Sequence, residues 1–176
     1  MNELIPNIAD MAFDGAALLM PCEFIALDES NKIEDEYESD RLIASMNAWL
    51  KLKATNTLTL DVILEVHKIL MQPTATIAKR DKGVWRTDDI VIAGRMGTPF
   101  DQVPSEMARW MTLFGDSHHL DSIQQAHVAY ERIHPFADGN GRSGRMIMNW
   151  QRMKAGFPIA VIFAAKRHEY YTWFAD

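Results

Sequence analysis

The sequence predicts a mainly α-helical fold that carries one small β-hairpin. Several windows repeat apolar residues at helical spacing, and one window bounded by glycines holds a short run of β-branched residues. The chain has 176 residues, of which 48% are hydrophobic, which is enough to bury the core of one domain and short for two. We therefore expect a single domain over residues 1–176, built as a compact helical bundle.

Two strong helical windows come first along the chain, over residues 38–54 and 57–71. The apolar stripe of the first window consists of Leu42, Ile43, Met46, Trp49 and Leu50. The stripe of the second window consists of Val62, Ile63, Val66, Ile69 and Leu70. Thr59 is the expected N-cap of the second helix, and Pro73 is expected to end it.

Later windows are also helical, and they span residues 103–115, 122–133, 143–156 and 166–174. Pro104 stands in the first turn of one window, and Gly115 and Gly156 stop two of them. The window before Pro135 aligns Ile123, Ala126, Tyr130 and Ile133 on one face. The chain therefore continues as helices up to its last residues.

Residues 82–100 do not have a helical pattern. Trp85 and the run from Ile90 to Ile92 lie between glycines and turn residues. This arrangement favours a small β-hairpin, just upstream in sequence of the helices that lead to residues 134–145.

Composition limits the partners and the compartment. The net charge is −6 and there is no long basic run, so we expect no nucleic-acid partner. Cys22 is the only cysteine, which excludes an intramolecular disulfide and suits a reducing compartment. The apolar stretch 11–27 is too short and too interrupted to span a bilayer, and the first residues lack the basic region of a signal peptide. We expect a soluble, cytoplasmic protein with no membrane partner.

The stretch HPFADGNGRSGR, residues 134–145, concentrates polar and flexible residues in an otherwise helical and apolar chain. The proline after His134 disfavours helical geometry there, so the preceding helix must end. Gly139 and Gly141 permit positive φ and let backbone N–H groups converge on an anion. A new helix is expected near Arg142, and helix N-termini bind phosphate.

The charged groups of this stretch suit a multiply charged phosphate group. Arg142 and Arg145 are three residues apart and share a helix face. Asp138 alone would repel phosphate, but Mg²⁺, which binds a carboxylate together with phosphate oxygens, removes that conflict. The side chain of His134, with an ordinary pKa near ~6.5, suits the removal of a proton from a nucleophile.

Each of these features alone has a simpler explanation. Gly-Asn-Gly is more often an ordinary turn, and a histidine before proline is usually a capped or core residue. No Gly-Lys-Ser/Thr follows, so this is no Walker A loop. His118 and His119 are adjacent, which turns them in different directions, and no His-Glu-x-x-His is present, so they are expected to face solvent. The joint spacing favours a phosphate site, with Phe136 as an apolar anchor of the loop.

At residues 134–145 the sequence resembles the Fic-domain family, whose motif H-x-F-x-D/E-G-N-G-R-x-x-R it matches at every fixed position. Residues 126–136 resemble the family's helix that leads into the motif, and residues 82–94 resemble its flap hairpin. GFPIAVI and RHEYY resemble its C-terminal elements. The resemblance implies a Fic fold over the chain, with a flap near 83–94 beside the active-site loop.

The resemblance also implies a Mg²⁺-dependent nucleotidyltransferase that moves AMP from ATP to a hydroxyl side chain of a target protein. It implies that His134 deprotonates the hydroxyl and that Asp138 holds Mg²⁺ on the α- and β-phosphates. The implied phosphate-binding residues are Gly139, Asn140 and Gly141 as the anion hole, Arg142 as a general grip, and Arg145 on the γ-phosphate. The implied target-docking residues of the flap are Gly83, Ile90, Val91 and Ile92.

A weaker pattern lies in residues 28–40, DESNKIEDEYESD. Ser30 and Glu34 are four apart and share a helix face. In the simplest interpretation Ser30 or Asp28 is an N-cap, and the acidic residues after it favour the positive start of a helix.

The same residues resemble the inhibitory motif S/T-x-x-x-E-G/N that Fic proteins often carry. Ser30 and Glu34 match it, and Asp35 stands where the family has Gly or Asn. The resemblance implies an inhibitory helix near 28–37, in which Glu34 pairs with Arg145 and restrains it from holding the γ-phosphate. The chain is then expected to be autoinhibited.

Other functions remain open beside AMP transfer. They are removal of AMP from a target with help from Glu34, transfer of another phosphate-linked group, and a catalytically suppressed nucleotide-binding module of the toxin–antitoxin type. The intact motif and His134 favour AMP transfer. The sequence leaves open the target protein, the net direction of the reaction, and whether the chain forms a homo-oligomer.

Overall fold

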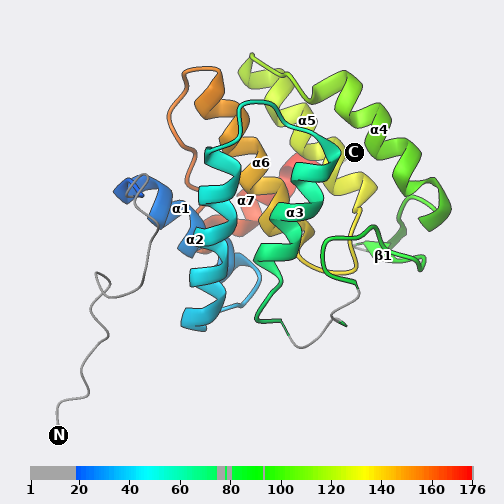
Figure 1. Cartoon of the computed structure of the whole chain (residues 1–176), viewed down its shortest axis with the longest axis horizontal. Coiled ribbons are helices and arrows are strands. Elements are labelled where there is room, and N and C mark those ends of the chain that lie inside the picture. The colour runs from blue at the N-terminus through cyan, green and yellow to red at the C-terminus, as the bar shows by residue number, and fades with distance from the viewer. Residues whose placement is uncertain (1–18, 75–77, 79–80, 93, 176) are drawn as a thin grey trace, which may run out of the picture.

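The computed structural model describes residues 19–74, 78, 81–92 and 94–175, and helices form most of them (Figure 1). The α-helices are α1 (Pro21–Ile33), α2 (Ser39–Lys53), α3 (Leu60–Leu70), α4 (Val103–Phe114), α5 (Leu120–Ile133), α6 (Asn140–Lys154) and α7 (Arg167–Tyr171), and 3-10 turns span Phe100–Gln102, Ala164–Lys166 and Thr172–Phe174. The strands β1 (Val91–Ile92) and β2 (Arg95–Met96) form a hairpin, so the predicted fold class is confirmed. Within the described part of the chain, no helix is both long and apolar enough to cross a bilayer.

Helix α6 lies at the centre of the bundle, with α1 and α2 on one side and α4 and α5 on the other (Figure 1). Its side chains are buried on every face from Arg142 to Gln151. A helix enclosed in this way needs no one-sided apolar stripe, which explains why its sequence mixes apolar residues with arginine, serine and asparagine.

Helix α2 buries a different face from the predicted one. Of the predicted stripe only Trp49 is fully buried, and the others are half-buried. The fully buried residues are Ala44, Ser45, Ala48, Trp49 and Leu52. Because α2 packs against α1, α3 and α6, small side chains let these helices approach closely, and the larger residues fill the edges.

Helix ends follow the predicted local chemistry at two places. The hydroxyl oxygen of Thr59 accepts a hydrogen bond from the Val62 N–H at 3.2 Å, as expected of an N-cap. Helix α5 ends at Ile133, and His134 adopts a left-handed conformation with φ of 52° before Pro135. The predicted end of this helix at the polar loop is therefore confirmed.

The strand pair lies inside the predicted window 82–100 and extends past Gly94, where the implied flap near 83–94 was expected to end. Val91 pairs with Met96 in antiparallel register, and the Gly97 N–H donates to the Ile90 carbonyl at 2.9 Å. Ile90, Val91 and Ile92 thus belong to the hairpin as expected.

Gly83, in contrast, lies outside the hairpin and against α3. A β-carbon at Gly83 would come within 2.7 Å of Lys68 Cβ and 2.8 Å of the Leu64 carbonyl oxygen, and the φ of this glycine is +76°. Trp85 packs on Phe136 with ring centroids 5.2 Å apart. Residues 83–85 therefore form a loop that packs against α3 and Phe136, and the first strand begins only at Val91.

The helix expected near 28–37 begins and ends earlier, as α1. Asp28 and Ser30 lie inside it, so neither is an N-cap, and the simplest interpretation of these residues is wrong. The start of α1 is explained by Pro21 at its first position and by the carboxylate of Glu23, which accepts the Met20 N–H at 2.7 Å. Because Ser30 lies inside α1 and does not cap it, its hydroxyl can bond to a neighbouring helix.

Replacement of Thr59 by alanine is expected to lower the free energy of unfolding by about 1 kcal/mol, because the Val62 N–H loses its acceptor. Urea unfolding followed by circular dichroism measures the change. Thr59→Ser keeps the hydroxyl oxygen and should unfold close to the wild type. An equal loss in both variants would show that the capping bond is not the cause.

Candidate active site

His134 stands where α5 ends and the polar loop begins. Its Nδ1 atom lies 3.3 Å from the carbonyl oxygen of Glu131. A carbonyl oxygen can only accept, so Nδ1 carries the proton and Nε2 keeps its lone pair. Burial lowers the pKa of His134 below 6.5, so the ring is neutral at pH 7. A neutral imidazole with a free Nε2 can act as a base.

Glu131 is a second titratable group beside His134 that sequence reasoning missed. Its Oε2 lies 3.9 Å from His134 Nδ1, and burial raises the pKa of this carboxyl to about 7. A glutamate on a helix is usually solvated, so its burial could not be read from the helical pattern.

The loop after His134 is closed by a reciprocal pair of hydrogen bonds. The Phe136 N–H donates to Asn140 Oδ1 at 2.8 Å, and Asn140 Nδ2 donates to the Phe136 carbonyl at 2.9 Å. Both residues are buried. The side chain of Asn140 therefore clamps the loop, and Phe136 anchors it in the core as predicted.

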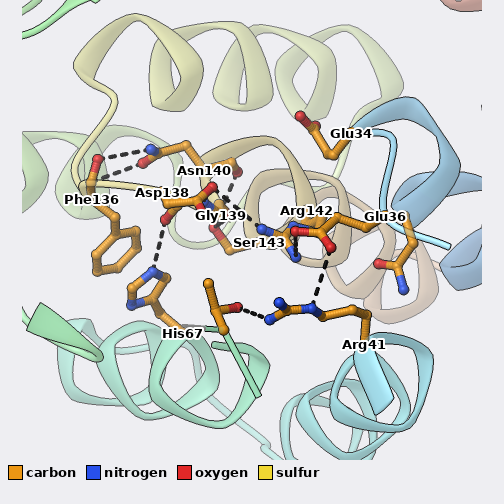
Figure 2. Close-up of polar contacts among 12 residues, drawn as sticks. Glu34, Glu36, Arg41, His67, Phe136, Asp138, Gly139, Asn140, Arg142 and Ser143 are labelled. Atoms are coloured by element: carbon orange, nitrogen blue, oxygen red, sulfur yellow. Dashed lines mark hydrogen bonds and ion pairs between the residues drawn. The ribbon is translucent and has the colours of Figure 1, made fainter. Parts of the chain in front are cut away.

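His67 supports the loop from below, and nothing in the sequence singled it out (Figure 2). Its ring stacks on Phe136 with centroids 3.6 Å apart. The Gly83 N–H donates to Nδ1 at 2.9 Å, so Nε2 must carry the proton that it shares with the Asp138 carbonyl at 2.9 Å. Burial lowers the pKa of His67 to about 4, which keeps the ring neutral. This histidine fixes the backbone at Asp138.

The carboxylate of Asp138 lies at the start of α6. Its Oδ1 accepts the Gly139 N–H at 2.5 Å and lies 3.3 Å from Arg142 Nη2. Gly139 has a φ of +77°, and a β-carbon there would lie 2.6 Å from Met71 Sδ, so the position requires glycine. The second carboxylate oxygen of Asp138 is not paired with any described residue. The partly exposed carboxylate can therefore bind a cation that also contacts a bound phosphate.

Arg142 is buried and is bracketed by acidic groups (Figure 2). Besides Asp138, Glu36 approaches it, with Oε1 3.7 Å from Arg142 Nη1. Glu36 in turn lies 3.2 Å from Arg41 Nε, and Arg41 contacts Thr74. Sequence reasoning did not find Glu36, because it lies past the inhibitory motif and looked like a solvated charge.

Arg145 is buried, and its guanidinium contacts the end of α1. Its Nε donates to Ser30 Oγ at 2.8 Å, and its Nη2 donates to the Ser30 carbonyl at 3.0 Å and to Glu34 Oε1 at 2.7 Å. Its Nη1 lies 3.4 Å from the hydroxyl of Tyr170. The two residues of the predicted inhibitory motif thus hold the last arginine of residues 134–145.

The end of α1 explains why Asp35 stands where the family has Gly or Asn. The Glu36 N–H donates to the Asn31 carbonyl and the Asp35 N–H to the Lys32 carbonyl, both at 3.1 Å. This is the Schellman pattern, which needs a left-handed residue after the helix, and Asp35 has a φ of 57°. Aspartate is among the few non-glycine residues that adopt this conformation readily. The departure at Asp35 is therefore compatible with the turn.

Glu34 also lies over the N-terminus of α6. The first intrahelical bond closes at the Ser143 N–H, so the N–H groups before it face the site. A β-carbon on Gly141 would collide with Glu34 Oε1 and lie 2.9 Å from Arg145 Nη1. The absence of a side chain at Gly141 lets an anion reach both the helix end and Arg145.

The structure brings Ser30 and Glu34 together with most of the predicted loop residues, and His134 lies close enough to Glu34 and Asp138 to interact with both electrostatically. The loop residues in this group are Asp138, Gly139, Asn140, Gly141, Arg142 and Arg145. The structure leaves Gly83 on α3, away from the strand pair. His118 and His119 are exposed, as expected.

A model of the Fic/DOC family matches residues 57–151. The chain belongs to this family. Among curated relatives, the protein adenylyltransferase Fic of Nematostella vectensis is 27% identical over 172 residues, which cover 93% of this chain and 36% of the relative. That of Aedes aegypti is 30% identical and covers 93% of this chain and 30% of the relative. This chain thus spans about a third of the length of these relatives.

Solved Fic structures share the fold. A Fic-domain-containing signalling protein from Bacteroides thetaiotaomicron superposes with a TM-score of 0.74 over 85% of this chain and 69% of that one, at 19% identity. Fic-1 of C. elegans gives a TM-score of 0.75 over 88% of this chain and 55% of that one, at 20% identity. The Fic fold expected from residues 134–145 is confirmed.

His127 connects the C-terminal α7 to the core beside Arg145, and this contact gives a pH-dependent stability. Its Nε2 lies 2.7 Å from the Tyr170 hydroxyl, and burial together with the charge of Arg145 lowers the pKa of His127 from 6.5 to about 3. The neutral ring is favoured by folding, so its contribution is complete above pH 6.5 and is lost as the pH falls towards 3. Between pH 7 and pH 5 the loss should be roughly 2 kcal/mol.

Urea unfolding of wild type and His127→Gln at both pH values tests this expectation. Glutamine can hydrogen-bond to Tyr170 but does not titrate, so the pH-dependent loss should be smaller in the variant by that amount. Other buried titratable groups contribute equally to both proteins and cancel in the difference. Identical pH dependence of the two proteins would contradict the assignment.

Proposed function

We propose that this chain is the catalytic Fic domain of a protein adenylyltransferase, which transfers AMP from ATP to a Tyr, Thr or Ser hydroxyl of a target protein. The observation that carries the proposal is the convergence of a neutral His134 with Asp138, two buried arginines and the open N-terminus of α6. The naming of several relatives as protein adenylyltransferases supports it.

The residues suit an in-line displacement at the α-phosphorus. The target hydroxyl oxygen forms a bond to this phosphorus while the bond to the bridging oxygen of the β-phosphate breaks, and pyrophosphate leaves. His134 Nε2 takes the hydroxyl proton, since Nδ1 is occupied by the Glu131 carbonyl. The N–H groups at the start of α6, with Arg142 and Arg145, stabilise the charge on the phosphate oxygens.

Asp138 fits the role of a Mg²⁺ ligand by the chemistry of its donors. One oxygen is fixed by Gly139 and Arg142, and the Asp138 side chain is 39% exposed. Mg²⁺ is typically held by one or two carboxylates and by substrate phosphates. A bound ion would supply positive charge that neutralises the phosphates.

The contact between Glu34 and Arg145 supports autoinhibition. Arg145 Nη2 bonds to Glu34 Oε1 at 2.7 Å, so the donor that would hold the γ-phosphate is engaged by a carboxylate. ATP then binds with its α-phosphorus out of line with the acceptor hydroxyl. We also propose a cytoplasmic location, because a chain with one cysteine suits a reducing compartment.

ATP labelled on the α-phosphate, and separately on the γ-phosphate, tests the reaction in the presence of Mg²⁺ and a cell lysate. Glu34→Gly should increase α-label on protein at least about tenfold, and Glu34→Gly/His134→Ala should show none. Asp35→Gly is the matched control, because it changes the same turn without touching Arg145, and it should stay as weak as the wild type. Label from the γ-position would mean phosphoryl transfer, and no label in any variant would contradict the proposal.

Asp138→Asn in the Glu34→Gly background tests the metal. The amide keeps the shape and loses the charge that attracts Mg²⁺, so the Mg²⁺ concentration for half-maximal AMP transfer should rise at least about tenfold. ADP affinity without Mg²⁺, measured by calorimetry, should not fall. If the Mg²⁺ dependence of Asp138→Asn is unchanged, Asp138 is not a Mg²⁺ ligand.

A further inference from the structure

Arg86 is a buried arginine in the loop before the hairpin, and its guanidinium donates to main-chain oxygens. It is 5% exposed. Its Nη1 donates to the Asp88 carbonyl at 2.7 Å, and its Nη2 donates to the carbonyl of Thr98. Burial lowers the pKa of this guanidinium, which marks the position as costly for a cation.

The same side chain also holds the segment around His134. Its Nε donates to the His134 carbonyl at 2.8 Å, and Nη2 lies 3.4 Å from the Ile133 carbonyl. The backbone N–H of Arg86 donates to the Pro135 carbonyl at 3.0 Å. His134 has a positive φ of 52°, an uncommon conformation for a residue other than glycine that surrounding contacts must maintain.

These contacts connect two parts of the site that are far apart in sequence. Asp88 precedes β1 and Thr98 follows β2, so they are the two ends of the hairpin. The hairpin has little packing of its own, since its strands are two residues long and Val91 and Met96 are 64% and 68% exposed. Its placement relative to His134 therefore depends on its base, where Arg86 lies.

We propose that Arg86 is a positioning residue that holds the hairpin and His134 in one frame, so that a hydroxyl presented at the hairpin meets His134 Nε2. This inference rests on the proposed AMP transfer. A planar guanidinium has donors in several fixed directions and can reach carbonyls from both segments at once. Lysine has a single charged nitrogen and can serve only part of this set.

Arg86→Lys and Arg86→Ala in the Glu34→Gly background test the inference, with Arg152→Ala as the matched control. Arg152 also donates to a main-chain carbonyl, that of Pro158 at 2.9 Å, but lies at the other end of α6. The rate of α-label transfer to lysate proteins at saturating ATP should fall about 100-fold in both Arg86 variants. ADP affinity should not change, since Arg86 contacts no residue of the phosphate site. Millimolar guanidinium chloride should partly restore Arg86→Ala and not Arg86→Lys.

Amide hydrogen exchange gives a readout that does not depend on activity. The Gly97 N–H, bonded to Ile90, should exchange about tenfold faster in Arg86→Lys, while amides of α6 keep their protection. Unchanged Gly97 exchange, or unchanged transfer, would overturn the inference. If the Glu34→Gly parent transfers no AMP, the proposed function fails, and exchange at Gly97 alone decides whether Arg86 holds the hairpin. Arg86→Lys suffices for this test if Arg86→Ala does not fold.

Discussion

The buried guanidinium of Arg145 is the constraint on which the arrangement of this site depends. A cation enclosed by protein is strongly destabilising unless its donors are paired, and Arg145 is 4% exposed. Its partners are Ser30 and Glu34 at the end of α1 and Tyr170 of α7. The end of α1 and α7 are more than 100 residues apart in the chain. Pairing this one side chain therefore holds two distant segments around α6, and it places the Glu34 carboxylate beside Gly141 at the start of that helix.

The turn after α1 makes that placement possible. Glu34 is the last residue before the chain reverses, and the left-handed conformation of Asp35 closes the helix with two backbone bonds. Asn31 ties this end of α1 to α2 by accepting the Ser45 hydroxyl at 2.9 Å. Glu36 emerges from the same turn towards Arg142. A single helix terminus thus presents carboxylates to both arginines.

The sequence predicted correctly those features that depend on residues a few positions apart. Thr59 as a cap, the end of α5 before Pro135 and the glycine turn at Gly139 all depend on neighbours along the chain, and these expectations held. The expected bounds of α1 and the expected buried face of α2 were wrong, because packing against several partners decided them. The sequence did not point to His67, Glu36 or Arg86, because their partners lie far away or were not recognisable from local spacing. His67, for example, bonds to a carbonyl 71 residues away, and only the packing of the helices brings the two together.

Within the proposed function, inhibition is a competition between two anions for one place. Gly141 has no side chain, so the carboxylate of Glu34 or a phosphate can lie against the α6 N-terminus and Arg145. The two partners of the ion pair differ in exposure, since the Arg145 side chain is 5% exposed and that of Glu34 is 36% exposed. When a γ-phosphate replaces the carboxylate, Arg145 remains paired and Glu34 enters water. Neither state buries an unpaired charge, so the proposed exchange avoids the cost of an uncompensated buried ion.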